Sequence, residues 1–154
     1  RAKPGPMSVR VELFDIRDAN RMREAMTIRF AVFVDEQGVP ENEEIDAHDR
    51  TDAAALHALA YDGTLPVATG RFFLRQDRAA QIGRMAVMPD ARGSGVGRMV
   101  LDALMAEARG RGIARAVLFA QTHALAFYER AGFTAYGEPF LDAGIAHVAM
   151  ERAL

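Results

Sequence analysis

The sequence predicts a single domain of the α/β class, in which helices cover a mixed central sheet. Two observations support this prediction. The pattern of apolar residues changes along the chain between strand-like runs and helical spacing, in the order strand, helix, three strands, helix, strand, helix and two strands. The chain has 154 residues, and 50% of them are hydrophobic, which suits one domain with a substantial core.

The first part of the chain predicts a strand followed by a helix. Residues 9–13 alternate apolar and polar side chains, as strands with one buried face do. Asp18 is a suitable N-cap for a helix in which apolar residues recur from Met22 to Phe33. The acidic segment 41–52 then predicts a loop or a short irregular helix.

Three consecutive strands are predicted in the middle of the chain. Residues 55–61 and 67–74 flank the dipeptide Asp62-Gly63, which is typical of a β-hairpin, and residues 81–88 form the third strand. The remaining predicted elements alternate between helix and strand: a helix from residue 96 to about 110, a strand over 116–120, a helix over 123–131 and two strands over 133–137 and 147–151.

Composition argues against several classes of protein. The 19 basic and 21 acidic residues give a formal net charge of -2, without the basic excess of nucleic-acid-binding domains. The chain has no cysteine, which excludes disulfides, thiolate metal sites and a cysteine nucleophile. No segment approaches the roughly 20 apolar residues of a membrane-spanning helix, and the N-terminus lacks the apolar core of a signal peptide.

These features predict a cytoplasmic protein that binds neither nucleic acid nor membranes. Residues 1–6 are interpreted as a disordered tail or a cloning remnant, and residues 7–154 as the single domain.

The segment PDARGSGVGRM, residues 89–99, predicts an anion site at the start of a helix. The first amides of a helix lack intrahelical partners, and the helix dipole places partial positive charge there. Glycines let the backbone approach an anion closely, and phosphate is its usual occupant. The segment lacks the lysine of a P-loop and follows the fourth strand rather than the first, unlike a dinucleotide fingerprint. A glycine-rich turn without a ligand is the alternative interpretation.

Two segments resemble motifs of the GNAT superfamily of N-acetyltransferases. Residues 87–97, VMPDARGSGVG, resemble its acyl-CoA signature, and residues 121–133, QTHALAFYERAGF, resemble its later motif. Within the family, three further segments look like a bacterial branch whose acceptors are mostly unknown: VFVDEQGVP at 32–40, EID at 44–46 and GIAHVAM at 144–150.

The resemblance spans residues 9–152 and implies the GNAT fold, a mixed sheet with helices on both faces and two splayed parallel strands in the middle. These two strands are residues 81–88 and 116–120. The resemblance also implies acetyl-CoA as co-substrate, with its pantetheine arm in the gap between the strands and its pyrophosphate on the glycine turn. No metal is expected. The residues implied to bind acetyl-CoA are Ala86, Val87, Arg92, Gly93, Ser94, Gly95, Val96, Gly97, Arg98, Gln121 and Tyr128.

Three residues are candidates for catalysis. The position of Tyr128 matches the general acid of the family, which gives a proton to the departing CoA sulfur. Glu36, on the acceptor side of the fold, is the first candidate for the base that deprotonates the amine. His147 is the second, since a neutral imidazole accepts a proton near pH 7. Each has a structural alternative: Tyr128 and His147 as packing residues, and Glu36 as a paired surface charge.

We expect an N-acetyltransferase that acts by direct attack of an amine in a ternary complex, because no cysteine can carry the acyl group. The alternative is a non-catalytic acyl-CoA sensor or interaction module on the same fold. The acceptor is a small-molecule or peptide amine whose identity the sequence leaves open, and a homodimer is compatible with the family.

The acidic segment from Glu41 to Asp49 would either attract a cationic amine or form a solvated face.

Overall fold

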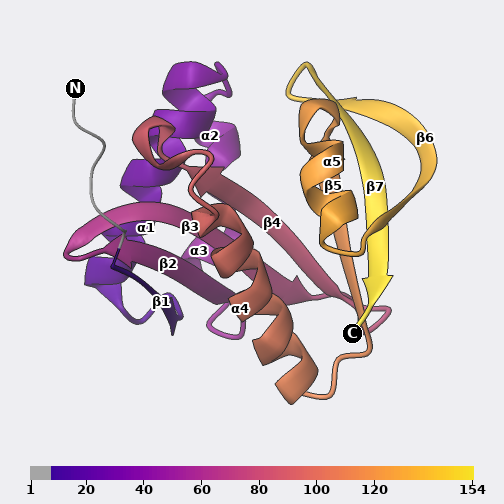
Figure 1. Ribbon diagram of the computed structural model, residues 1–154, viewed down its shortest axis with the longest axis horizontal. Helices are drawn as coiled ribbons and strands as arrows, with labels where there is room; N and C mark the ends of the chain where they lie inside the picture. The colour runs from indigo at the N-terminus through magenta and orange to yellow at the C-terminus, as the bar shows by residue number, and fades with distance from the viewer. Residues whose placement is uncertain (1–7) are drawn as a thin grey trace.

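Residues 8–154, which the computed structural model describes, form one seven-stranded sheet in the strand order β1-β2-β3-β4-β5-β7-β6 (Figure 1). The interpretation of residues 1–6 as a tail lies outside the described residues. The strands are β1 (Val9–Phe14), β2 (Leu56–Asp62), β3 (Leu65–Leu74), β4 (Ala80–Val87), β5 (Arg115–Gln121), β6 (Thr134–Asp142) and β7 (Ile145–Ala153).

The helices confirm the predicted order of elements. They are α1 (Ala19–Arg29), which continues into the π-helical η1 (Phe30–Glu36), the single turns α2 (Glu41–Glu44) and α3 (Ala47–Arg50), the 3-10 turn η2 (Pro89–Ala91), α4 (Val96–Gly110), the 3-10 turn η3 (Thr122–Ala124) and α5 (Leu125–Arg130). None of the helices in the described part of the chain is long and apolar enough to cross a membrane.

Local signals explain where several elements begin and end. The side chain of Asp18 accepts a hydrogen bond from the backbone N–H of Arg21, so Asp18 caps α1 as predicted. Gly63 adopts a φ of 61° in the β2–β3 hairpin, and Gly132 adopts a φ of 92° after α5.

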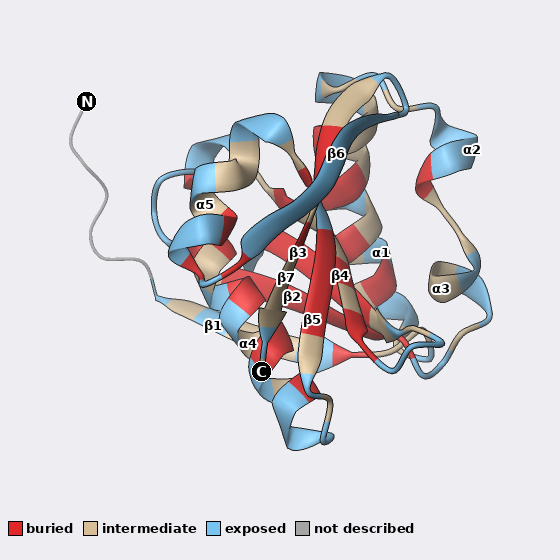
Figure 2. Ribbon diagram, turned by 90° about the vertical axis from the view of Figure 1, so that its right-hand side faces the viewer, coloured by how far each residue is buried: buried red, intermediate tan, exposed pale blue. Residues whose placement is uncertain are grey.

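The last two strands are longer than predicted. β6 is exposed along its whole length (Figure 2), so its side chains show no apolar alternation. A register shift against β7 between Tyr136 and Phe140, around Pro139, further obscures the strand in the sequence.

Helices cover both faces of the sheet, as the burial of β2 shows. Ala58 and Ala60 pack in the core under α4, whereas the alternate residues Leu59 and Tyr61 pack in the core under α1. Successive residues of a strand face opposite sides of a sheet, so the almost continuously apolar β2 is buried on both.

The central parallel strands separate partway along their length. β4 and β5 pair only through Ala80 with Ala116, Gln81 with Val117 and Ile82 with Leu118. Beyond Ile82, residues 83–87 of β4 continue without pairing to β5. Figure 1 shows the two strands meeting near the C-terminus and diverging away from it. The splay implied by the family resemblance is therefore present.

Candidate functional site

The gap between β4 and β5 opens into a cleft of about 1000 Å³. Its walls come from elements that are far apart in the sequence: residues 81–87 of β4, the end of β5, η1 with the loop after it, α5 and the β6–β7 hairpin. Glu36, Gln121, Tyr128 and His147, four of the residues singled out from the sequence, all line this cleft.

A β-bulge in β4 shapes the wall of the cleft. Thr69 pairs with Ala86 and Arg71 with Gly83, so that Arg84 and Met85 together oppose the single residue Gly70. A Cβ at Gly70 would overlap the sulfur of Met85 and crowd Val100 and Leu104, so any larger residue there would displace these side chains. Arg84 adopts a φ of 53°, which costs a non-glycine residue on the order of 1–3 kcal/mol. Such strain is typical of functional sites.

The glycine turn presents free backbone amides at the start of α4. Gly93 and Gly95 adopt φ values of 80° and 88°, which glycine reaches without steric cost. Within residues 8–154, the amides of Gly93, Gly95, Gly97 and Arg98 have no hydrogen-bond acceptor. The turn thus has the unpaired donors and the helix dipole of an anion site.

The other three amides of the turn are engaged with the protein. Those of Arg92 and Ser94 donate to the carbonyl oxygens of Pro89 and Ala91 at 3.2 and 3.3 Å, and that of Val96 lies 3.4 Å from the Ser94 hydroxyl. The free amides are therefore fewer than the run from Arg92 to Arg98 that the sequence indicates for an anion site. The Ser94 hydroxyl itself donates to the Ala91 carbonyl.

The two arginine side chains of the turn also have protein partners. Arg92 holds both carboxylate oxygens of Glu36, at 3.0 and 2.5 Å, and its Nε donates to the carbonyl of Val87. Arg98 pairs with Asp102 one turn along α4 and donates to the carbonyl of Arg130.

The pair with Arg92 decides what Glu36 can do. Hydrogen bonds from Arg92 hold the pKa of the Glu36 carboxyl below its ordinary value. A carboxylate that is already bound and has a lowered pKa is a weak base. The first candidate base therefore lines the cleft as the partner of Arg92 in an ion pair.

Tyr128 lies on α5 with 8% of its surface exposed and contacts the rings of Phe127 and Phe133 edge to face. It packs in the core and also lines the cleft. Its hydroxyl makes no hydrogen bond to any residue between 8 and 154. Burial raises the pKa of the Tyr128 phenol above its usual value of about 10, so the hydroxyl carries its proton at neutral pH. The group is a proton and hydrogen-bond donor without a protein acceptor.

His147 is buried beside the cleft, and its ring stacks on that of Phe140. Its Nδ1 lies 2.7 Å from the carbonyl oxygen of Ile145. A carbonyl oxygen only accepts, so Nδ1 carries the hydrogen of this bond. In the neutral ring, Nε2 then has a free lone pair, which is the form a general base requires.

Gln121 is joined to a residue that the sequence analysis did not single out. The side-chain amides of Gln121 and Gln37 donate to each other, at 2.8 and 3.2 Å, and connect the end of β5 to the loop after η1. His123 also reaches the Gln121 oxygen. Gln37 belongs to the segment VFVDEQGVP, so the family resemblance was the signal that could have indicated it.

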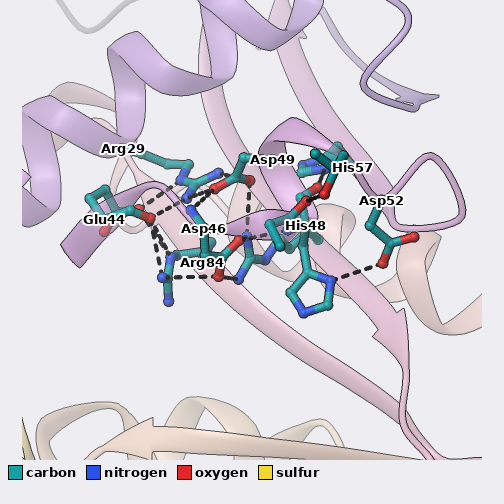
Figure 3. Close-up of polar contacts among 11 residues, drawn as sticks. Arg29, Glu44, Asp46, His48, Asp49, Asp52, His57 and Arg84 are labelled. Carbon is teal, nitrogen blue, oxygen red and sulfur yellow. Dashed lines mark hydrogen bonds and ion pairs between the residues drawn. The ribbon is translucent and has the colours of Figure 1, made fainter. Parts of the chain in front are cut away.

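The acidic segment 41–52 forms a network with three arginines from α1, β3 and β4 (Figure 3). Arg29 binds Glu44 and Asp49, and Arg71 binds Asp46 and Asp49, at distances between 2.5 and 2.9 Å. Burial opposes ionisation of Asp49, but hydrogen bonds from Arg29 and the charges of both arginines outweigh it and hold its pKa below the ordinary value.

The network corrects one hypothesis about this segment. Glu44, Asp46 and Asp49 are matched by three arginines, so they do not form a free negative surface for a cationic amine. Among the acidic residues of the segment, Glu43 is exposed and lines the cleft.

A mixed sheet with splayed central strands and a turn of free amides beside them defines the GNAT fold. The chain belongs to the GNAT acetyltransferase family, since the family model described as "Acetyltransferase (GNAT) family" matches residues 19–133.

Individual relatives agree with this assignment. The chain is 36% identical over 137 residues to the uncharacterized N-acetyltransferase YjcF of Bacillus subtilis, which covers 88% of this chain and 95% of that protein. It is similar to the crystal structure of an acyl-CoA N-acyltransferase from Pseudomonas aeruginosa, with a TM-score of 0.82, 30% identity and coverage of 95% and 100% of the two chains. Escherichia coli ElaA has a TM-score of 0.83 with 26% identity, over 94% of this chain and 99% of that one.

Proposed function

We propose that this protein transfers an acetyl group from acetyl-CoA to an amine by direct attack in a ternary complex. The proposal is carried by one arrangement. An unpaired stretch of β4 and the protonated Tyr128 line a single cleft, and the lining residues Val87 and Arg92 connect this cleft to the four free amides at the start of α4. Membership in an acetyltransferase family and relatives named as N-acetyltransferases support it.

The proposed donor half consists of residues 83–87 of β4, which line the cleft, and of the glycine turn that follows the lining residue Arg92. It fits CoA in two ways. The free amides of Gly93, Gly95, Gly97 and Arg98 would hold the pyrophosphate at the positive end of the helix dipole. Backbone groups of β4 beyond the splay would pair with the amides of the pantetheine arm, which is the role assigned to Ala86 and Val87. Binding at the Val87 carbonyl would require Arg92 to release it.

Acetyl-CoA supplies an acetyl group activated as a thioester. His147 accepts the proton of the attacking amine at Nε2, while its Nδ1–H stays on the Ile145 carbonyl. A new C–N bond forms to the acetyl carbon, the C–S bond breaks, and the Tyr128 hydroxyl donates its proton to the leaving sulfur. The geometry supports His147 rather than Glu36 as the base, because Glu36 is held by Arg92.

Tyr128→Phe tests this function directly. The variant keeps the packing of the ring and removes only the proton donor, so we expect turnover to fall about 100-fold or more, as is typical for loss of a general acid. The affinity for acetyl-CoA, measured by calorimetry, should stay within about threefold, since binding rests on the backbone amides.

Two outcomes would contradict the proposal. Unchanged turnover in Tyr128→Phe would remove this residue from the mechanism. If the wild-type protein binds acetyl-CoA but a broad panel of amines gives no release of CoA thiol, the alternative of a non-catalytic acyl-CoA sensor is favoured.

A further inference from the structure

Arg84 differs from the other charged residues of the cleft in its backbone conformation. It lies two residues beyond Ile82, the last β4 residue that pairs with β5, and its positive φ of 53° belongs to the bulge opposite Gly70. The bulge places a charged side chain on the wall of the cleft, with 28% of that side chain exposed. Non-glycine residues held in this region of φ are concentrated at functional sites.

Of the three arginines in the buried network, Arg84 is the least well neutralised. Arg29 and Arg71 bind their carboxylates at 2.5 to 2.9 Å. The contacts of Arg84 are longer: 3.1 Å to the Glu44 carboxylate, 3.2 and 3.3 Å to the Glu44 carbonyl and 3.5 Å to Asp46. Both carboxylates are already bound more closely by another arginine. Charge-assisted hydrogen bonds are shorter when they are stronger, so the positive charge of Arg84 is the least compensated of the three.

Two arginine nitrogens of this network have no hydrogen-bond acceptor in the described part of the chain. The Nη1 group of Arg84 has no acceptor within residues 8–154, and the buried Nε of Arg71 also has none. Figure 3 shows the free terminal nitrogen of Arg84 directed away from Glu44 and Asp46. Burial and the charge of Arg71 lower the pKa of Arg84, but a guanidinium remains charged at neutral pH. A ligand with an anionic oxygen could accept a hydrogen bond from the free Nη1 of Arg84.

A carboxylate suits the position better than a phosphate. Glu44 and Asp46 lie within 3.5 Å of the Arg84 guanidinium, so a doubly charged group would be repelled more strongly than a singly charged one. Glu43 and Asp142 also line the cleft, but they are exposed, and solvent screens their charges more than that of the largely buried Arg84.

We propose that Arg84 binds a carboxylate on the acceptor, so that the preferred acceptor is a primary amine that also carries a carboxylate, such as an amino acid. This inference rests on the proposed acetyl transfer in the same cleft. It makes Arg84 a specificity-determining residue and leaves acetyl-CoA binding to the glycine turn.

A series of ω-amino acids from glycine to 6-aminohexanoate tests the proposal, because it varies the distance between amine and carboxylate. The matched controls are alkylamines of the same chain length, and O-phosphoethanolamine replaces the carboxylate by a phosphate. We expect at least one ω-amino acid to exceed its alkylamine about tenfold or more in kcat/KM. In Arg84→Gln this advantage should disappear, mainly through KM, while alkylamines change by less than about threefold. Arg84→Lys, which keeps the charge at the same backbone position, should be intermediate.

Three results would overturn the carboxylate site: alkylamines used as well as every ω-amino acid, preference for O-phosphoethanolamine, or an equal loss for both acceptor types in Arg84→Gln. Calorimetry of the ω-amino acids on the CoA-loaded protein separates this inference from the proposed function. Binding that depends on Arg84 without CoA release would refute acetyl transfer alone. Acetylation of alkylamines without any binding preference for carboxylates would refute the Arg84 site alone.

Discussion

The proposed donor half of the cleft presents backbone groups, whereas the proposed acceptor half presents charged side chains. In the donor half, the free amides of residues 93–98 lie within six consecutive positions, and their direction follows from two positive-φ glycines and the start of α4. In the acceptor half, which is bordered by Arg71, Arg84 and segment 36–44, the hydrogen bonds of the network join residues 15 to 40 positions apart. A backbone site thus depends on local conformation, while a side-chain site depends on the complete fold.

The largest effect that separates the two halves is expected from Asp49→Asn. Asp49 is shared by Arg29 and Arg71, both almost fully buried, so the variant leaves buried positive charge without compensation. We expect a loss of about 3 kcal/mol or more in the free energy of unfolding, measured with urea at neutral pH. Asp102→Asn, which breaks the exposed pair with Arg98, is the matched control and should cost less than about 1 kcal/mol.

The sign of the pH dependence follows from the lowered pKa of Asp49. The contribution of Asp49 to the free energy of unfolding is fully present above the unfolded-state pKa of about 3.9. It is lost progressively as the pH falls below that value. Wild-type stability should therefore decrease toward acid more steeply than that of Asp49→Asn. Equal costs for Asp49→Asn and Asp102→Asn would show that the network does not hold the acceptor half together.

A smaller effect distinguishes the two candidate bases. His147→Asn retains a donor for the Ile145 carbonyl but removes the second ring nitrogen, so we expect turnover to fall about 100-fold. Glu36→Gln should leave turnover at saturating substrate within about threefold, because Glu36 is bound to Arg92 and the proposed base is His147. A large loss in Glu36→Gln with full activity in His147→Asn would reverse the assignment.

The fold was largely predictable because its elements carry local signals. Asp18, the Asp62-Gly63 turn and Gly132 mark element ends with residues whose conformational preference is known. The extent of β6 was not predictable, since an edge strand with both faces exposed needs no apolar pattern and shows none. The splay of β4 and β5 came from the family resemblance rather than from periodicity.

The site was predictable only in part. The glycine turn carries a local signal of its own, and the resemblance of a contiguous motif to the family indicated Tyr128. The pairing of Glu36 with Arg92 spans 56 positions and that of Gln37 with Gln121 spans 84, and no local pattern reports such contacts. In the sequence, Arg71 and Arg84 are only charged residues within apolar strands. Their role depends on the acidic segment that folds against them, and the sequence does not show that contact.

The central claim is that free amides at the start of α4 bind the pyrophosphate of acetyl-CoA, and Gly95→Asp beside Gly95→Asn tests it most directly. A Cβ at Gly95 meets no atom within 4 Å, and Asp and Asn have the same shape and tolerate its positive φ. The two variants therefore differ only in a negative charge beside the proposed phosphate. Calorimetry with CoA should show binding to Gly95→Asn that is about tenfold or more tighter than to Gly95→Asp, because like charge at the site costs more than 1 kcal/mol. Equal affinity of the two variants would contradict the account.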